Sequence, residues 1–407
     1  MPGDAERVPL FRYAGLVRAY EAVRRFLRNP DALSALYQVV LCVLIAGVVY
    51  LALANAAENL SRAKIATGFG FWDVTAGFDI NQTLISYSAQ SSTYGRAFWV
   101  GLLNTLLVSA LGIVFATIIG FLVGIGRLSR NLLVARLAGF YVETIRNVPL
   151  LLQLLFWYNA VLKVLPELRD SHVLFGGIVL SNRGFYLPKP MFGPQIVWVV
   201  AALVFGIVVS AVVAGVAKRR RERTGQRLPV IAIAFSLVVG LPLLVFVAAG
   251  SPVTFDNPIM GRFNISGGME ILPEFMALLF GLAIYTAAFI AEAVRAGILA
   301  VAKGQTEAAY ALGLRATPTL RLVIVPQAMR VIIPPLTNQY LNLIKNSSLA
   351  VAIGYPDFVQ IFTGTVLNQT GQAVEIVVLT MAVYLAISLV TSLAMNWYNA
   401  RIALTER

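Results

Sequence analysis

Long apolar runs restrict the possible folds of this chain more than any other feature of its sequence. A helix needs about 20 predominantly apolar residues to cross the hydrocarbon core of a bilayer. Eight stretches reach that length, and they cover approximately residues 34–56, 97–126, 140–165, 194–217, 229–250, 271–302, 331–354 and 374–400. We therefore expect an all-α polytopic membrane protein with about eight transmembrane helices.

The composition agrees with this class of protein. The chain is 58% hydrophobic and 13% charged, whereas soluble domains are roughly 45–50% apolar and about 25% charged. The third stretch is the weakest of the eight, because the polar sequence ETIRN occupies 143–147 and the continuous apolar part begins only at Val148. The first stretch is longer than the h-region of a signal peptide, so we expect an uncleaved anchor.

The basic residues predict the orientation. If the N-terminus is cytoplasmic, the inside segments carry 21 of the 32 Lys and Arg residues and the outside loops carry 8. Short cytoplasmic loops are enriched in Lys and Arg, so we expect both termini in the cytoplasm. The run KRRRERTGQR at 218–227 then faces the lipid headgroups of the cytoplasmic leaflet. The net charge of +13 is therefore a membrane-topology signal, and we expect no nucleic-acid partner.

Several kinds of chemistry lack the residues that they need. The chain has one cysteine, Cys42, and one histidine, His172. This excludes an intramolecular disulfide framework and disfavours a cysteine- or histidine-rich metal site. No paired carboxylates or nucleophile constellation occur at membrane depth, so we expect no catalytic residues and no metal ligands. No G-x-x-x-x-G-K-[ST] phosphate loop is present, and the chain is therefore not expected to hydrolyse ATP itself.

A mostly polar segment separates the sixth and seventh apolar stretches, with the sequence GQTEAAYALGLRATPTLRLVIVPQAMR at 304–330. Thr306 is suited to cap a helix that Gly313 would end, and Thr317-Pro318 is a second start signal. Each helical piece is shorter than about 12–15 residues, the length at which an isolated helix becomes even marginally stable in water. Other contacts must therefore stabilise each piece. The residues alone leave two alternatives open: packing on the same chain, or docking to a cytoplasmic partner.

Three further blocks of this sequence are informative: ETIRNVPLLLQLLFWY at 143–158, AEAVRAGILAVAKGQTEAAYALGL at 291–314 and VPQAMRVIIPPLTNQYLNLIKNSSLAVAIG at 325–354. These blocks resemble permeases of the polar amino acid uptake branch of ABC importers. The spacing from Glu307 to Pro326 is similar to the EAA loop of that family, with valine at both aliphatic positions of the usual Ile-x-Leu-Pro ending. The whole chain resembles the general L-amino acid permease type, in a branch that includes histidine, glutamate, glutamine and arginine importers.

The resemblance implies a set of partners and a domain organisation. Residues 1–94 would hold a basic cytoplasmic N-terminus, an extra transmembrane helix and a periplasmic loop. Residues 95–400 would form the permease domain of a type I importer, with an inserted helix pair at about 194–250, and residues 401–407 a cytoplasmic tail. The expected partners are two copies of an ATPase that uses ATP and Mg, a second permease that is expected to be a paralogue rather than the same chain, a periplasmic amino acid-binding protein and membrane lipid. The chain itself would bind no cofactor.

The same resemblance assigns the coupling to the ATPase to one loop. In such permeases the EAA loop is a helix that sits in a groove on the ATPase. Carried over to this sequence, the coupling residues are Glu307, Ala308, Ala309, Leu312, Gly313 and Arg315.

Polar residues gather on one side of the seventh stretch. At 100° per residue they fall within an arc of about 120°; they are Asn338, Gln339, Asn342, Lys345 and Asn346. Polar groups at this depth are functional candidates, so we expect this face to line the substrate pathway. An interhelical hydrogen-bond seam is the alternative. Gln153 in the third stretch is a further pathway candidate.

Two acid–base pairs lie at the cytoplasmic ends of apolar stretches. Glu292 with Arg295, and Glu143 with Arg146, are each three residues apart and can meet on one helix face. We expect structural ion pairs at the interface, with a role in gating as the alternative.

The importer permease is therefore the first functional hypothesis: a multi-pass subunit of a bacterial inner membrane that passes polar L-amino acids from a periplasmic receptor. The alternative is a stand-alone ion-coupled secondary transporter. That class would require acidic groups or histidine deep in the membrane for coupling, and it would leave the segment 304–330 unexplained.

Overall fold

The computed structural model describes residues 20, 30–62, 67–167, 170–174, 177–226, 228–261 and 264–402. The expected basic N-terminus and most of the expected C-terminal tail lie outside these residues. The chain divides into two compact units, one of residues 1–69 with 370–375 and the other of residues 70–369 with 376–407. In the first unit, α2 (Pro30–Arg62) is one continuous helix, and Gly68 donates its backbone N–H to Glu375 Oε1 at 2.6 Å.

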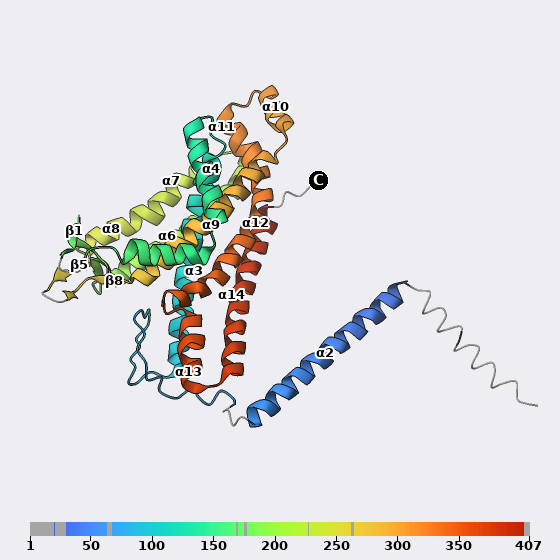
Figure 1. Cartoon of the computed structure of the whole chain (residues 1–407). Helices are drawn as coiled ribbons and strands as arrows, with labels where there is room; N and C mark the ends of the chain where they lie inside the picture. The colour runs from blue at the N-terminus through green and yellow to red at the C-terminus, as the bar shows by residue number, and fades with distance from the viewer. Residues whose placement is uncertain are drawn as a thin grey trace, which may run out of the picture. The chain divides into compact units, whose positions relative to one another are not determined.

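Seven helical runs among the described residues are long and apolar enough to cross a membrane. Besides α2 they are α3 (Tyr94–Gly126), α6 (Ile196–Thr224), α9 (Pro273–Leu299) and α14 (Ala373–Ile402), together with two composite runs. One joins α7 (Val230–Phe235), η4 (Ser236–Gly240) and α8 (Leu241–Ala248), and the other contains α12 (Val325–Asn346) (Figure 1). The expectation of a helical polytopic protein is confirmed.

The third expected span is wrong as a single helix. The segment is divided into α4 (Leu132–Asn147), α5 (Leu150–Leu155) and the π-helix η1 (Phe156–Leu162). Pro149 has no backbone N–H and disfavours a helical conformation at Val148, so α4 ends there. The Gln153 side chain spans the break, because its Nε2 donates to the carbonyls of Ile145 and Val148, each at 2.9 Å.

The main core is built where α3, α9 and α12 meet and α5 joins them. Its buried members include Val108 and Ala116 of α3, Leu154 of α5, Leu278 and Leu282 of α9, and Ile332 and Leu343 of α12. Gly120 and Gly124 bring α3 against α9: a β-carbon added at Gly120 would lie 2.6 Å from Ile290 Cβ, and one at Gly124 would lie 2.7 Å from the Ala291 carbonyl oxygen. Such close backbone approach is the usual way in which glycines spaced by four residues join membrane helices.

A second core lies at the N-terminal end of α3, where the loop 71–87 packs with η7 (Gln360–Val366) and α14. Its polar centre is the fully buried Asp357. The Asp357 carboxylate accepts hydrogen bonds from the Gln360 backbone N–H at 2.8 Å and from the Tyr384 hydroxyl at 3.0 Å. Nearby, Asn104 of α3 donates its amide to the carbonyls of Gln82 and Pro356, each at 2.9 Å. The Asn104 oxygen has no hydrogen-bond partner among the described residues, whereas its amide nitrogen and the Asp357 carboxylate are bonded. Such buried hydrogen bonds favour one arrangement of the chain.

The substitution Tyr384→Phe should therefore lower stability. It removes one of the donors to a buried carboxylate, a loss that we estimate at about 2 kcal/mol. We expect the thermal unfolding midpoint in detergent, measured at a fixed scan rate, to fall by a few degrees. Tyr398→Phe on the same helix is the control, because Tyr398 is exposed. Equal midpoints for the two variants would contradict a stabilising role for the Tyr384 hydroxyl.

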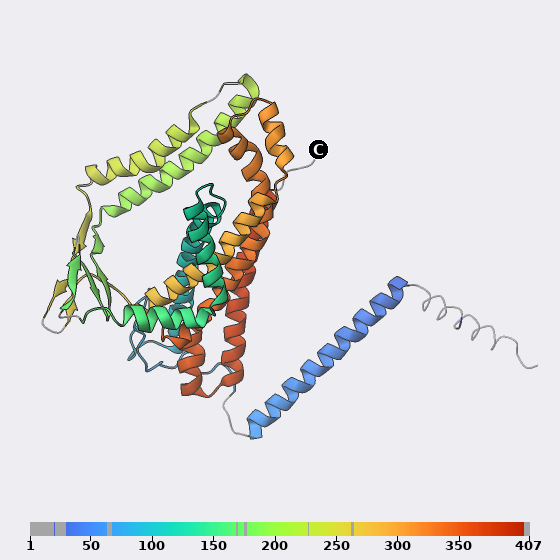
Figure 2. The ribbon, with the colours of Figure 1, turned by 45° about the horizontal axis from the view of Figure 1, so that its top comes forward.

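The expected insertion is a pair of antiparallel helices, α6 and the α7–η4–α8 run, which lie side by side (Figure 2). Gly206 permits this contact, because an added β-carbon there would lie 2.1 Å from the Leu237 carbonyl oxygen. No residue of α7, η4 or α8 is buried. Their apolar side chains are therefore available to lipid or to another chain.

Short strands precede and follow this helix pair, and the sequence did not predict them. One sheet has the order β1 (His172–Leu174), β2 (Ile178–Ser181), β3 (Gly184–Leu187) and β8 (Met269–Ile271), with neighbouring strands antiparallel. The other pairs are β4 (Lys189–Phe192) with β5 (Val253–Asp256), and β6 (Ile259–Met260) with β7 (Ile265–Ser266). Tyr186 of β3 donates its hydroxyl to Glu270 of β8 at 2.9 Å, and burial together with this contact raises the pKa of Tyr186 to about 12.

Candidate functional site

The segment between α9 and α12 begins with the helix α10 (Lys303–Ala311). The expected N-cap at Thr306 is wrong by four residues. Ala302 has an extended backbone conformation and is the N-cap, and the Gln305 N–H already donates to the Ala302 carbonyl at 3.0 Å. Thr306 therefore lies inside the helix and does not cap it.

Gly313 ends α10, as its position in the sequence predicts. Its φ is +76°, a left-handed conformation that favours glycine. The Gly313 N–H donates to the Tyr310 carbonyl at 2.9 Å, and the Leu314 N–H donates to the Ala309 carbonyl at 3.1 Å. This pair of bonds is the Schellman motif, which satisfies the last carbonyls of the helix and turns the chain sharply.

The second piece of the segment is continuous with α12. It starts at α11 (Ala316–Thr319), with Arg315 rather than Thr317 as the N-cap, and passes through the π-helix η5 (Leu320–Ile324). Pro326 therefore lies within a continuous helical run and does not interrupt it. The π-helix ends at Ile324, two residues before Pro326. Proline has no backbone N–H, so one hydrogen bond of a regular α-helix would be missing at this position, and the wider π-helical turn lies next to that site.

The loop presents a small, smooth surface. Ala309 is buried, while Glu307, Ala308 and Arg315 are exposed and the Leu312 side chain is 82% exposed. A largely exposed leucine close to an exposed alanine is suited to a partner's groove, because the described part of this chain leaves most of its side chain uncovered. Gln327 of α12 donates to Gln305 of α10 at 3.0 Å, which ties the loop to the membrane helix that follows it.

The structure brings the five polar residues of α12 together on its open side. Asn338, Asn342 and Lys345 are exposed, and Gln339 and Asn346 are half-buried. The opposite side of the helix is buried, with Ile332, Ile333, Leu336, Leu343 and Ile344. Among the described residues, no hydrogen bond joins any of the five polar side chains to the rest of the chain. Next to them, Tyr340 and Thr117 of α3 share a hydrogen bond of 2.7 Å.

Gln153 does not belong to that face. Its side chain is buried and its amide nitrogen is engaged by the break between α4 and α5. Its Oε1 has no hydrogen-bond partner among the described residues. The arrangement accounts for Gln153 as a group that holds the helix break.

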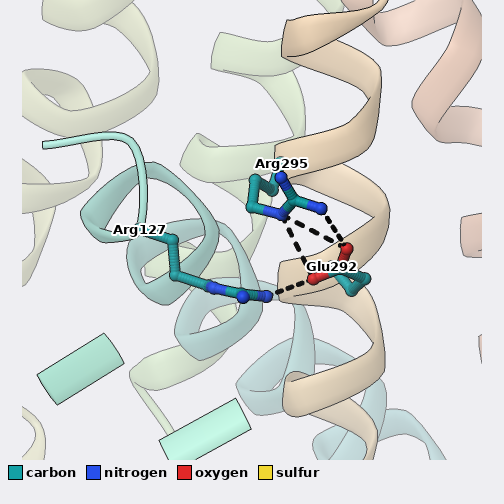
Figure 3. Close-up of polar contacts among 3 residues, drawn as sticks. All are labelled: Arg127, Glu292 and Arg295. Carbon is teal, nitrogen blue, oxygen red and sulfur yellow. Dashed lines mark hydrogen bonds and ion pairs between the residues drawn. The ribbon is translucent and has the colours of Figure 1, made fainter. Parts of the chain in front are cut away.

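Glu292 pairs with Arg295 as the spacing predicts, and it also pairs with a residue that the sequence reading missed (Figure 3). Arg295 Nη2 lies 2.5 Å from Glu292 Oε1, and Arg127 Nη1 contacts Glu292 Oε2. The side chains of Arg127, Glu292 and Arg295 are 18%, 28% and 32% exposed. The available signal for Arg127 was its position as the first residue after the apolar run of α3.

The second predicted pair, Glu143 with Arg146, is not formed. Both side chains are exposed, and no ion pair between them occurs in the described structure. The Arg146 guanidinium instead lies over the ring of Phe289 on α9, 5.0 Å from its centroid. A cation over an aromatic face is a favourable contact, so Arg146 joins α4 to α9 rather than to its own helix.

The described residues contain no group of three or more His, Cys, Asp or Glu side chains that could hold a metal ion. The family of the binding-protein-dependent transport system inner membrane component matches residues 206–404.

Three relatives match nearly the whole chain. General L-amino acid transport system permease protein AapQ of Rhizobium johnstonii is 54% identical, over 94% of this chain and 96% of that protein. Putative amino-acid ABC transporter permease protein YhdX of Escherichia coli is 52% identical, over 93% and 96%. Glutamate/glutamine/aspartate/asparagine transport system permease protein BztB of Rhodobacter capsulatus is 42% identical, over 91% and 93%.

The chain belongs to the family of binding-protein-dependent transport system inner membrane components. It is a permease subunit of an ABC importer with the type I fold, located in the inner membrane, and it is a transport component rather than an enzyme. Importers of this kind use ATP through a partner ATPase and work with a binding protein and a second permease. The ion-coupled secondary transporter is not favoured.

Proposed function

We propose that this permease imports polar L-amino acids delivered by a periplasmic binding protein. The observation that carries the proposal is the likeness over almost the full length to permeases named for general L-amino acid transport and for glutamate, glutamine, aspartate and asparagine. The chemistry of α12 is consistent with such substrates. Amide side chains can hydrogen-bond both a carboxylate and an ammonium group, and Lys345 can pair with the carboxylate.

The polar face of α12 lines the translocation pathway in this proposal. Its members are Asn338, Gln339, Asn342, Lys345 and Asn346. Two observations support this assignment over a hydrogen-bond seam within the chain: the face is open, and its side chains make no hydrogen bonds to other described residues. Polar groups at bilayer depth need a partner or water, and a pathway supplies both.

The loop formed by α10 and the Gly313 turn is the coupling element in this proposal. Glu307, Ala308, Leu312, Gly313 and Arg315 contact a groove on the ATPase, while the buried Ala309 packs beneath them. The exposure of Leu312 and the sharp Schellman turn support this role. Two ATPase copies bind the permease pair, and ATP and Mg are held by them and not by this chain.

The remaining parts of the proposal concern assembly. The second permease is a paralogue rather than a copy of this chain. Residues 95–400 form the permease domain, and the α6–α8 helix pair is an insertion in it. Glu292 with Arg295 acts at the cytoplasmic end of α9 as a structural or gating group.

Transport by the purified complex tests the proposed function. Wild-type complex in proteoliposomes should accumulate labelled glutamine, glutamate, histidine or arginine only when ATP is inside with the ATPase and the receptor is outside. Omission of either ATP or receptor should reduce uptake to the level of empty vesicles. The control is a proton or sodium gradient imposed without ATP. Uptake driven by such a gradient alone would contradict the importer function.

A further inference from the structure

Arg127 occupies a distinctive place at the end of α3 that the charge distribution assigns to the cytoplasm. α3 ends at Gly126, and Arg127 is its C-cap residue. A cation at a helix C-terminus is favoured by the helix dipole. The Arg127 side chain does not extend to solvent like the exposed Arg130 but turns to Glu292 of α9, where Arg295 also binds (Figure 3).

The contact continues a tight interface between the two helices. Gly120 and Gly124 place the backbone of α3 against Ile290, Ala291 and Val294 of α9. The Arg127–Glu292 pair follows within one turn of Gly124. The cytoplasmic half of α3 is therefore joined to α9 first by backbone contact and then by an ion pair at the tip. A pair that is mostly shielded from solvent is weakened less by salt than an exposed one.

α9 leads directly into the coupling loop. Only residues 300–302 separate the end of α9 from α10. On its other side, Gly297 of α9 lies against α12, where an added β-carbon would lie 2.4 Å from Ile332 Cγ1. A displacement of α10 is therefore transmitted to α9 through this short connection. α12 is joined to the same loop by the hydrogen bond from Gln327 to Gln305. α3 is not continuous with the loop. Ten residues before Arg127, Thr117 of α3 is hydrogen-bonded to Tyr340 of α12, but the end of α3 at Gly124 and Arg127 is attached to α9. The movement of that end therefore depends on its attachment to α9.

We propose that Arg127 is a positioning residue for energy coupling: through Glu292 it fastens the cytoplasmic end of α3 to α9, so that α3 moves with α9 when the coupling loop is displaced. The inference rests on the proposed role of the coupling loop. Arg295 lies on the same helix as Glu292, pairs with its carboxylate and orients it toward Arg127. Arg127 is the member that connects two helices.

The test is the number of amino acid molecules imported per ATP hydrolysed by the reconstituted complex. In Arg127→Gln the Glu292 charge keeps Arg295 as its partner, so we expect folding and ATPase binding to survive. Loss of a part-buried ion pair should lower import per ATP about fivefold, while receptor-stimulated ATPase activity remains near wild type. Arg127→Lys keeps the charge and should restore most of the import per ATP.

Arg130→Gln is the matched control, because it removes the same charge three residues away from an exposed side chain. It should leave import per ATP unchanged. A wild-type ratio in Arg127→Gln would overturn the inference, and so would a parallel loss of ATPase binding and of import, which would show a purely structural role. These outcomes differ from failure of the proposed function, in which the wild-type complex itself would show no import that depends on ATP.

Discussion

Replacement of Gly313 by aspartate should reduce uptake to background while the permease remains folded in the membrane. The position tolerates the substitution locally. No atom lies within 4 Å of an added β-carbon, and aspartate is among the residues that adopt left-handed backbone conformations, at a penalty of about 1 kcal/mol. What changes is the surface of the turn, which gains a negative charge where the ATPase is proposed to dock. An uncompensated charge in a desolvated contact weakens binding by about 2–5 kcal/mol, or roughly 30- to 5,000-fold.

The variant Gly313→Asn distinguishes the effect of the added negative charge from the effect of the added side-chain volume. Asparagine has the same size and the same tolerance of positive φ, so it should retain most of the uptake. The measurements are co-purification of the ATPase with tagged permease and uptake in vesicles, after equal membrane content has been shown by immunoblot. Normal transport by a well-expressed aspartate variant would contradict docking at this turn.

Replacement of Lys345 by alanine should lower uptake about tenfold with little loss of assembly. The expectation follows from losing a charge–carboxylate contact of about 1.4 kcal/mol in the pathway. Lys345 is exposed in the single chain and has no ion pair or side-chain hydrogen bond among the described residues, so removing its side chain breaks no polar interaction there. Lys345→Arg keeps the charge and should transport better than the alanine variant.

The informative readout for Lys345 is a comparison of two activities in the same preparation. ATP hydrolysis stimulated by substrate-loaded receptor reports assembly and coupling, and labelled substrate inside the vesicles reports transfer. We expect the alanine variant to retain receptor-stimulated ATP hydrolysis and to lose much of the substrate transfer. Wild-type transfer by Lys345→Ala would make Lys345 a structural residue and remove it from the pathway.

The sequence was most informative for features that depend only on residues close together in the chain, such as membrane helices, helix ends and helix faces. Twenty apolar residues in a row predict a membrane helix whatever their neighbours are. A glycine after the last good helix former predicts the end of α10 at Gly313. The polar arc of α12 could be counted from sequence spacing, and the structure places all five residues on the open side of that helix.

The errors arose where neighbouring structure overrides local preference. Thr306 is a good capping residue, yet helix α10 had already begun at Lys303. Val148 begins an apolar run, but Pro149 directly after it forces a break that hydropathy does not register. Spacing correctly predicted Glu292 with Arg295 because both lie on one helix. It could not predict Arg127, which is distant in sequence, or the preference of Arg146 for an aromatic ring on another helix.

The absence of buried residues from α7, η4 and α8 has a practical consequence. The exposed side chains of this run, such as Leu243, Leu244 and Val247, can be exchanged with little effect on how the rest of the chain packs. Single cysteines placed along this run would carry fluorescent or spin labels at graded depths in the bilayer. Distances from these labels to labels on α9 and α12 would then measure the displacement of α9 and α12 during a transport cycle.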